Sequence, residues 1–148
     1  MTPELTELCE TLDGLRAGVL RKLAGLSEDD ARRSTVDSGT NVAGLVQHLT
    51  FVESLWLGEV VEGGKAVGNR SMRVDPSVSL TTLRATYRSA CAASNAIIER
   101  LGDADAPVTR NGKTHTLRWA MLAVIGETSR HAGHADIIRE QLDGQTGR

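Results

Sequence analysis

Apolar residues recur every three or four positions along four stretches of the chain, the spacing that gathers them on one face of a helix. These stretches predict helices over residues 3–23, 42–62, 79–101 and 116–142. Thr2 and Pro3 open the first helix, because proline at the first helical position loses no hydrogen bond, and Gly102 and Gly144 follow the third and the fourth. The apolar stripe of the second helix is predicted to be Leu45, Val52, Leu55 and Trp56.

Four amphipathic helices of similar length, each ~30–37 Å long, cannot bury their apolar faces alone. We therefore expect an all-α fold, an up-and-down four-helix bundle that occupies residues 1–148 as a single domain. Residues 26–30 predict a short capped turn of helix, and Asn111-Gly112 predicts a miniature hairpin. The connection over residues 63–76 is glycine-rich and long for such a bundle, and such segments are often lids or mobile loops.

The composition is that of a soluble globular protein, since 40% of the 148 residues are hydrophobic and 24% are charged. Aromatic residues make up only 3%, so the core must be aliphatic. A formal net charge of −2 without a basic block gives no reason to expect nucleic acid or a membrane surface as a partner. No apolar run reaches the ~20 residues of a membrane span, and the N-terminus does not resemble a signal peptide. Two cysteines, Cys9 and Cys91, are too few for a disulfide scaffold, so we expect a cytoplasmic protein with both thiols buried rather than reactive.

Three of the four histidines fall where polar side chains should be scarce. His48 lies on the apolar stripe of the second predicted helix, one turn after Leu45. Glu127 and His131 are four residues apart on the core side of the fourth helix and therefore stack on one face. A buried carboxylate without a partner costs several kcal/mol, and something must compensate it. A divalent cation bound by His48, Glu127 and His131 would do so, because zinc, nickel and iron accept nitrogen and oxygen donors.

Simpler interpretations compete with this metal site. A single buried histidine is more often a hydrogen-bonded core residue than a ligand, and Glu127 with His131 alone could be an ion pair one helical turn apart. His134 lies one turn beyond His131 and could be a fourth ligand, a base or a core hydrogen-bonding residue; we favour a place next to the ligands, from which it accepts a proton. His115, in the connection before the fourth helix, is expected to be exposed.

The second, third and fourth predicted helices carry motifs that resemble those of the DinB-like superfamily, across nearly the whole chain. The motifs are Ser38-Gly39-Thr40, Gly44-Leu45-Val46-Gln47-His48-Leu49, Val52-Glu53 with Trp56, Tyr87 to Ser94, Leu117-Arg118-Trp119, and Glu127-Thr128-Ser129-Arg130-His131-Ala132-Gly133-His134-Ala135-Asp136. The resemblance implies a four-helix bundle with a metal bound by one histidine of the second helix and two donors of the fourth. By position these are His48, Glu127 and His131, a His/Glu/His set similar to that of the mycothiol-dependent maleylpyruvate isomerases. Those enzymes have a further domain that this chain lacks, so their isomerisation is not carried over.

The resemblance also implies a transferase that uses a low-molecular-weight thiol, either mycothiol, bacillithiol or glutathione. Arginine outnumbers lysine fourteen to three, which hints at a GC-rich genome and favours mycothiol. Three protein ligands leave a position on the metal open, where a thiol would be bound as thiolate and attack an electrophile, or a water would hydrolyse a labile bond. In either case His134 would take the proton. The alternative is a non-catalytic metal-binding or stress-response protein. Leu122 and Ile125 give the fourth helix a second apolar side that a homodimer could bury.

Overall fold

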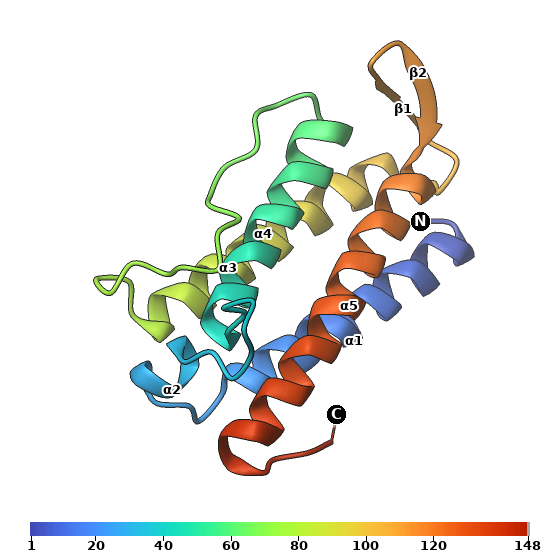
Figure 1. Cartoon of the computed structure of the whole chain (residues 1–148). Helices are drawn as coiled ribbons and strands as arrows, with labels where there is room; N and C mark the ends of the chain where they lie inside the picture. Colours follow the sequence, from blue (N-terminus) through green and yellow to red (C-terminus); the bar gives the residue numbers. More distant parts are fainter. Residues whose placement is uncertain (148) are drawn as a thin grey trace.

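The computed structural model describes residues 1–147, and most of them are helical (Figure 1). In chain order the elements are α1 (Pro3–Leu23), α2 (Glu28–Arg32), α3 (Val42–Glu53), the π-helix η1 (Ser54–Val61), α4 (Leu80–Leu101), β1 (Pro107–Arg110), β2 (Lys113–Thr116) and α5 (Leu117–Asp143). The predicted long helices, the short helix after Ser27 and the hairpin are confirmed. Gly102 and Gly144 end α4 and α5 in the left-handed region, at φ 68° and 76°, where glycine carries no steric penalty.

Apolar side chains of α1, α3, η1, α4 and α5 meet in one continuous core. It is aliphatic, as the composition predicts, and Tyr87 is the one aromatic side chain among those fully buried in residues 1–147. On α5 the buried positions include Ala120, Val124 and Ile138, spaced by one or more helical turns. The core therefore lies against the faces that the helical periodicity selects.

The directions of the long helices differ from the predicted up-and-down order. Glu4 forms an ion pair with Arg118 near the beginnings of α1 and α5. Farther along both helices, Lys22 forms an ion pair with Asp136. These two helices are therefore parallel. An ion pair between Glu62 and Arg100 likewise joins the ends of η1 and α4, so α3–η1 and α4 are also parallel. Consecutive parallel helices need a connection that returns along their length, and the up-and-down order predicted from equal helix lengths is wrong.

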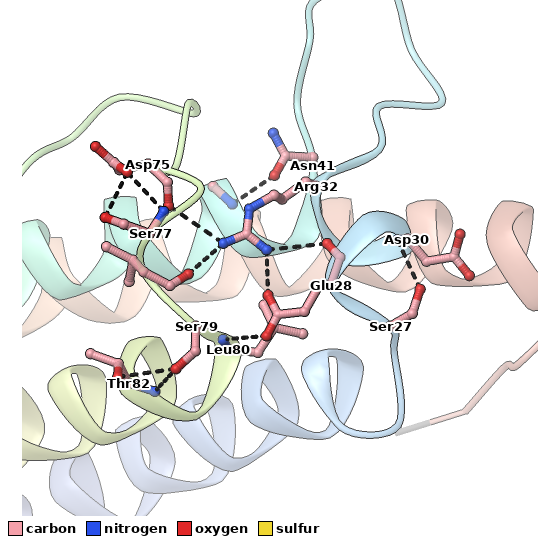
Figure 2. A network of polar contacts seen from close by, with 12 residues as sticks. Ser27, Glu28, Asp30, Arg32, Asn41, Asp75, Ser77, Ser79, Leu80 and Thr82 are labelled. Carbon is pink, nitrogen blue, oxygen red and sulfur yellow. Dashed lines mark hydrogen bonds and ion pairs between the residues drawn. The ribbon is translucent and has the colours of Figure 1, made fainter.

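Residues 62–79 make this return, and side chains of α2 and α3 fix the segment in place. Figure 2 shows Arg32 donating to the backbone carbonyl of Val78 while Glu28 accepts from the backbone N–H of Leu80 at 3.0 Å. Asn41, which caps α3, also donates to the Met72 carbonyl at 2.9 Å. A helix of about 20 residues is ~30 Å long, and the segment must cover that distance before α4 can begin. The return path therefore accounts for the length of the segment, which need not be a lid.

Gly44 permits the return segment to approach α3 closely. A Cβ at this position would lie 2.3 Å from the Met72 carbonyl oxygen, closer than any side chain tolerates. Gln47, on the next turn of α3, donates to the carbonyls of Ser71 and Arg73 at 2.8 and 3.1 Å. The segment thus lies against the N-terminal half of α3, and its backbone becomes part of the surroundings of His48.

The π-helix changes which side chains face the core. The predicted stripe continues from Val52 to Leu55 and Trp56, but in the structure Leu57 and Val60 are buried, and Leu55 and Trp56 are half-buried. A π-helix has more residues per turn than an α-helix, so each side chain is rotated away from its α-helical direction. Leu55 and Trp56 are consequently presented at the groove between η1 and α5.

A buried ion pair crosses the core at the junction of α3 and η1. Arg16 of α1 donates to both carboxylate oxygens of Glu53, at 2.8 and 2.7 Å, and their side chains are only 5% and 1% exposed. The same guanidinium also donates to Asp13 and to Asn95 of α4. One side chain therefore links three of the long helices.

Candidate metal centre

Two antiparallel helices bring the three predicted ligands together. His48 lies on α3, and Glu127 and His131 lie one turn apart on α5, whose Trp119 packs against Trp56 of η1. One ligand atom from each side chain can be chosen so that all three lie within 4.8 Å of one another. The structure thus joins the histidine of the second predicted helix to the pair of the fourth, which the sequence alone could only propose.

The distances fit a shared cation better than direct hydrogen bonds. Nε2 of His48 and Nε2 of His131 lie 3.5 and 3.4 Å from the same oxygen, Oε2 of Glu127. Both distances exceed the 2.7–3.2 Å usual for an N–H···O bond. Ligands bound to one ion at ~2.0–2.2 Å in tetrahedral geometry are separated by about 3.4 Å. The donor set, two imidazoles and a carboxylate, is also one that zinc and related divalent metals accept.

The hydrogen bonds of His48 leave one ring nitrogen free. Its Nδ1 lies 3.1 Å from the carbonyl oxygen of Arg70, which can only accept, so Nδ1 carries the proton. Nε2 is then the unprotonated nitrogen of the neutral ring. It is buried and has no hydrogen-bond partner in residues 1–147. A buried nitrogen with a free lone pair, oriented by a backbone carbonyl on its other side, is the usual arrangement of a metal-binding histidine.

His131 has a comparable arrangement, with His134 as its outer partner. The Nδ1 atoms of the two rings are 3.2 Å apart, and Nε2 of His131 faces Glu127. Burial, together with the nearby His48, lowers the pKa of His131, although Glu127 opposes the shift. The neutral form that can bind a metal is therefore favoured at pH 7. His134 itself is exposed and contacts the side of His131 away from Glu127.

The site lies at the edge of the core rather than inside it, which corrects one premise of the sequence argument. The exposed fractions of His48, Glu127 and His131 are 19%, 27% and 13%. Glu127 also accepts a hydrogen bond from Arg130 at 2.9 Å, so it is not an unpaired buried charge. Among residues 1–147, the fully buried carboxylate is that of Glu53. The three side chains are therefore sheltered but reachable from solvent.

A cleft of about 440 Å³ opens next to His48 and Glu127. Its walls are mostly apolar, and two arginines lie at its rim. The lining includes Phe51, Leu55, Trp56, Leu122, Arg70 and Arg130. The Arg70 guanidinium lies 5.9 Å from the centre of the Phe51 ring, in cation–π contact. We refer to this space as the metal-site cleft.

The remaining candidate residues lie elsewhere. Cys91 is half-buried near Tyr87 and Glu53, and burial raises the pKa of its thiol to about 12, so it is not a nucleophile. Burial also raises the pKa of the half-buried Cys9. His115, expected to be exposed, is half-buried and stacks on Trp119 with ring centres 3.8 Å apart. None of these three residues contributes to the group formed by His48, Glu127 and His131.

Two contacts of the site are not among the sequence predictions, and only one of them has a signal in the sequence. The Arg70 carbonyl reaches His48 only because the return segment runs back along α3. Arg130 is three residues after Glu127 on the same helix, and that spacing is a recognisable ion-pair signal that we did not interpret.

Comparisons with known proteins agree with this fold. The profile of the family described as mycothiol-S-transferase matches residues 7–144. A solved structure described as the conserved protein of a locus from Enterococcus faecalis superimposes with a TM-score of 0.75 at 13% sequence identity, over 98% of this chain and 100% of that chain. At this identity the likeness concerns the fold alone. No curated protein matches the chain. Among the described residues, no helix is long and apolar enough to cross a membrane.

Proposed function

The chain belongs to the mycothiol-S-transferase family, part of the DinB-like superfamily, and we propose that it transfers a mycothiol-type thiol to an electrophilic small molecule at a metal bound by His48, Glu127 and His131. The fold is interpreted as a DinB-like four-helix bundle in which residues 62–79 form the crossover. Zinc is the proposed metal, because two imidazoles and one carboxylate with a further open position are a common catalytic zinc set. The homodimer remains a prediction.

The observation that carries the proposal is the pair of Nε2 atoms that face one oxygen of Glu127 without bonding to it. A bound divalent cation would supply a Lewis acid that keeps a thiol in its thiolate form near neutral pH. The backbone carbonyl of Arg70 and the ring of His134 fix the orientations of the two imidazoles. Arg130 restrains the other oxygen of Glu127.

In the proposed reaction the S–H bond of the thiol breaks, a bond from sulfur to an electrophilic carbon forms, and a leaving group departs from that carbon with the electron pair of the bond that held it. The proton goes to His134 or to water. His134 is placed to accept it, because its exposed ring contacts His131 and is not one of the three proposed ligands. Within residues 1–147 neither cysteine is an activated nucleophile, since burial raises the pKa of both thiols. A sulfur supplied by a thiol cofactor is consistent with that chemistry.

The proposal is tested by measuring conjugate formation between mycothiol and an electrophilic fluorogenic probe, with purified protein that has been loaded with zinc or stripped of it. We expect metal-dependent turnover in the wild type and its loss in Glu127→Gln. Glu140→Gln, an exposed glutamate on the same helix, is the matched control and should retain activity. A folded, zinc-loaded protein with no conjugation activity would favour the non-catalytic alternative, and unfolding on chelation would make the metal structural.

A further inference from the structure

A second cleft, of about 310 Å³, lies where η1, the β1–β2 hairpin and the first turn of α5 meet. Its lining consists of Leu55, Trp56, Val60 and Trp119 together with the hairpin residues Arg110, Asn111, Lys113 and His115. We call it the hairpin cleft. Leu55 and Trp56 line the metal-site cleft as well, so the two spaces adjoin along the groove between η1 and α5. Figure 1 shows the hairpin projecting at the end of the molecule where α5 begins.

The floor of the hairpin cleft is aromatic. It contains both tryptophans of the chain, whose rings meet edge to face with centres 5.2 Å apart. Trp56 and Trp119 are half-buried, and neither indole N–H donates to another group in residues 1–147. His115 stacks on one face of Trp119, with ring centres 3.8 Å apart, and so extends the aromatic floor. A half-exposed tryptophan normally offers its apolar ring to one partner and its N–H to another. The π-helix presents Trp56 here, because it shifts burial from Leu55 and Trp56 to Leu57 and Val60.

The rim of the hairpin cleft is rich in hydrogen-bond donors without partners. Arg110 and Lys113 face each other across the hairpin, a pairing of like charges that costs stability. Neither forms an ion pair, and Asn111 makes no side-chain hydrogen bond, within the described chain. No acidic residue lines the cleft. Donors around an aromatic floor suit a ligand with flat apolar ring faces and many hydroxyl oxygens, which is the chemistry of a saccharide or cyclic polyol.

The position of the hairpin cleft relative to the metal centre indicates which saccharide. Trp119 precedes Glu127 by eight residues on α5, a distance of ~12 Å along the helix. Between them, Leu122, Ala123 and Gly126 line the metal-site cleft. A ligand with its thiol at the metal and two six-membered rings behind it would follow this groove. Mycothiol has that construction, since its cysteinyl group is joined to an amino sugar and the sugar to inositol.

We propose that the hairpin cleft binds the glucosamine–inositol head group of the thiol, with the rings against Trp56 and the stacked pair of His115 and Trp119, and with hydroxyls accepting from Arg110 and Lys113. This inference rests on the proposed function for the identity of the ligand. It assigns the β1–β2 hairpin to recognition of the cofactor, and it leaves the metal-site cleft, with Phe51 and Leu122, to the electrophile.

The test uses the intrinsic fluorescence of the two tryptophans, which needs neither metal nor turnover. The full-length protein is titrated with N-acetylglucosaminyl-inositol, which is the mycothiol head group without its thiol arm, and with inorganic phosphate. We expect the glycoside to change the emission saturably and to compete with mycothiol. Lys113→Ala and Arg110→Ala should each weaken glycoside binding about three- to ten-fold, the range for a lost hydrogen bond. Lys65→Ala, an exposed lysine of the return segment, should have no effect.

A second arm compares mycothiol with N-acetylcysteine as the thiol substrate of the zinc-loaded protein. Lys113→Ala should raise KM for mycothiol and leave the reaction with N-acetylcysteine unchanged. Unchanged KM for mycothiol in both hairpin variants, or a fluorescence response to phosphate but not to the glycoside, would overturn the assignment of the cleft while leaving the transferase proposal intact. Conversely, glycoside binding without any thiol conjugation would support the cleft and contradict the transferase.

Discussion

Replacing Arg16 by methionine should destabilise the protein severely, because it leaves a buried carboxylate without its partner. Glu53 is 1% exposed, and both of its oxygens accept from Arg16. Opposite charges about 4 Å apart attract by about 4 kcal/mol at an effective dielectric constant of 20. Breaking a buried pair by removing one member costs about 3–5 kcal/mol. Since a domain of this size has a total stability of about 5–15 kcal/mol, Arg16→Met removes a large fraction of it.

The assay is urea unfolding followed by circular dichroism, with the free energy of unfolding extrapolated to water. Arg16→Met should lower the midpoint without changing the slope. The double variant Arg16→Met/Glu53→Met, which removes both charges, should recover most of the loss. Asn95→Ala removes only one hydrogen bond to the guanidinium and should cost about 1 kcal/mol. A loss below about 1 kcal/mol in Arg16→Met, or a double variant less stable than the single one, would refute this reasoning.

Three further predictions concern packing, thiol reactivity and the orientation of a ligand. Gly44→Ala should lower stability by about 1–3 kcal/mol, measured by thermal unfolding, since its Cβ meets the Met72 carbonyl; an unchanged Tm would contradict the close approach. Cys91 should react with iodoacetamide at pH 8 far more slowly in the native protein than in urea. A thiol pKa of about 12 instead of 9.0 leaves roughly a thousandth of the thiolate that the unfolded chain has. Equal rates of alkylation, measured by mass spectrometry, would disprove its burial. His134→Phe should weaken zinc binding ~10–100-fold, measured by competition with a chelator, as it removes the partner of His131 Nδ1; unaltered affinity would mean that His134 does not orient the ligand.

Local geometry made the helices and half of the candidate site predictable from the sequence. Glu127 and His131 stack because four residues are about one helical turn, a relation that does not depend on the rest of the fold. Thr2-Pro3, Ser27 and Gly102 act within a few residues of the ends that they mark. The hairpin at Asn111-Gly112 follows from the same kind of local rule, and Asn111 has a positive φ of 51°.

Properties that depend on distant partners were not predictable in this way. The parallel arrangement of α3–η1 and α4 depends on the path of residues 62–79, whereas the sequence pattern over residues 63–76 is equally typical of a lid or a mobile loop. The burial of Leu57 instead of Leu55 depends on a π-helix that the α-helical period cannot reveal. Arg16 lies four residues after Leu12 and three before Val19, which places a charge on the buried stripe, but its partner Glu53 is 37 positions away.

The central claim is that one divalent cation binds between α3 and α5, and the zinc content of the purified protein tests it most directly. After saturation with zinc and removal of the excess, elemental analysis should find one ion per folded wild-type chain. His131→Ala, with its helical circular dichroism intact, should retain almost none, and His115→Ala should retain the wild-type amount. A full equivalent of zinc in folded His131→Ala, or none in the wild type, would contradict the account.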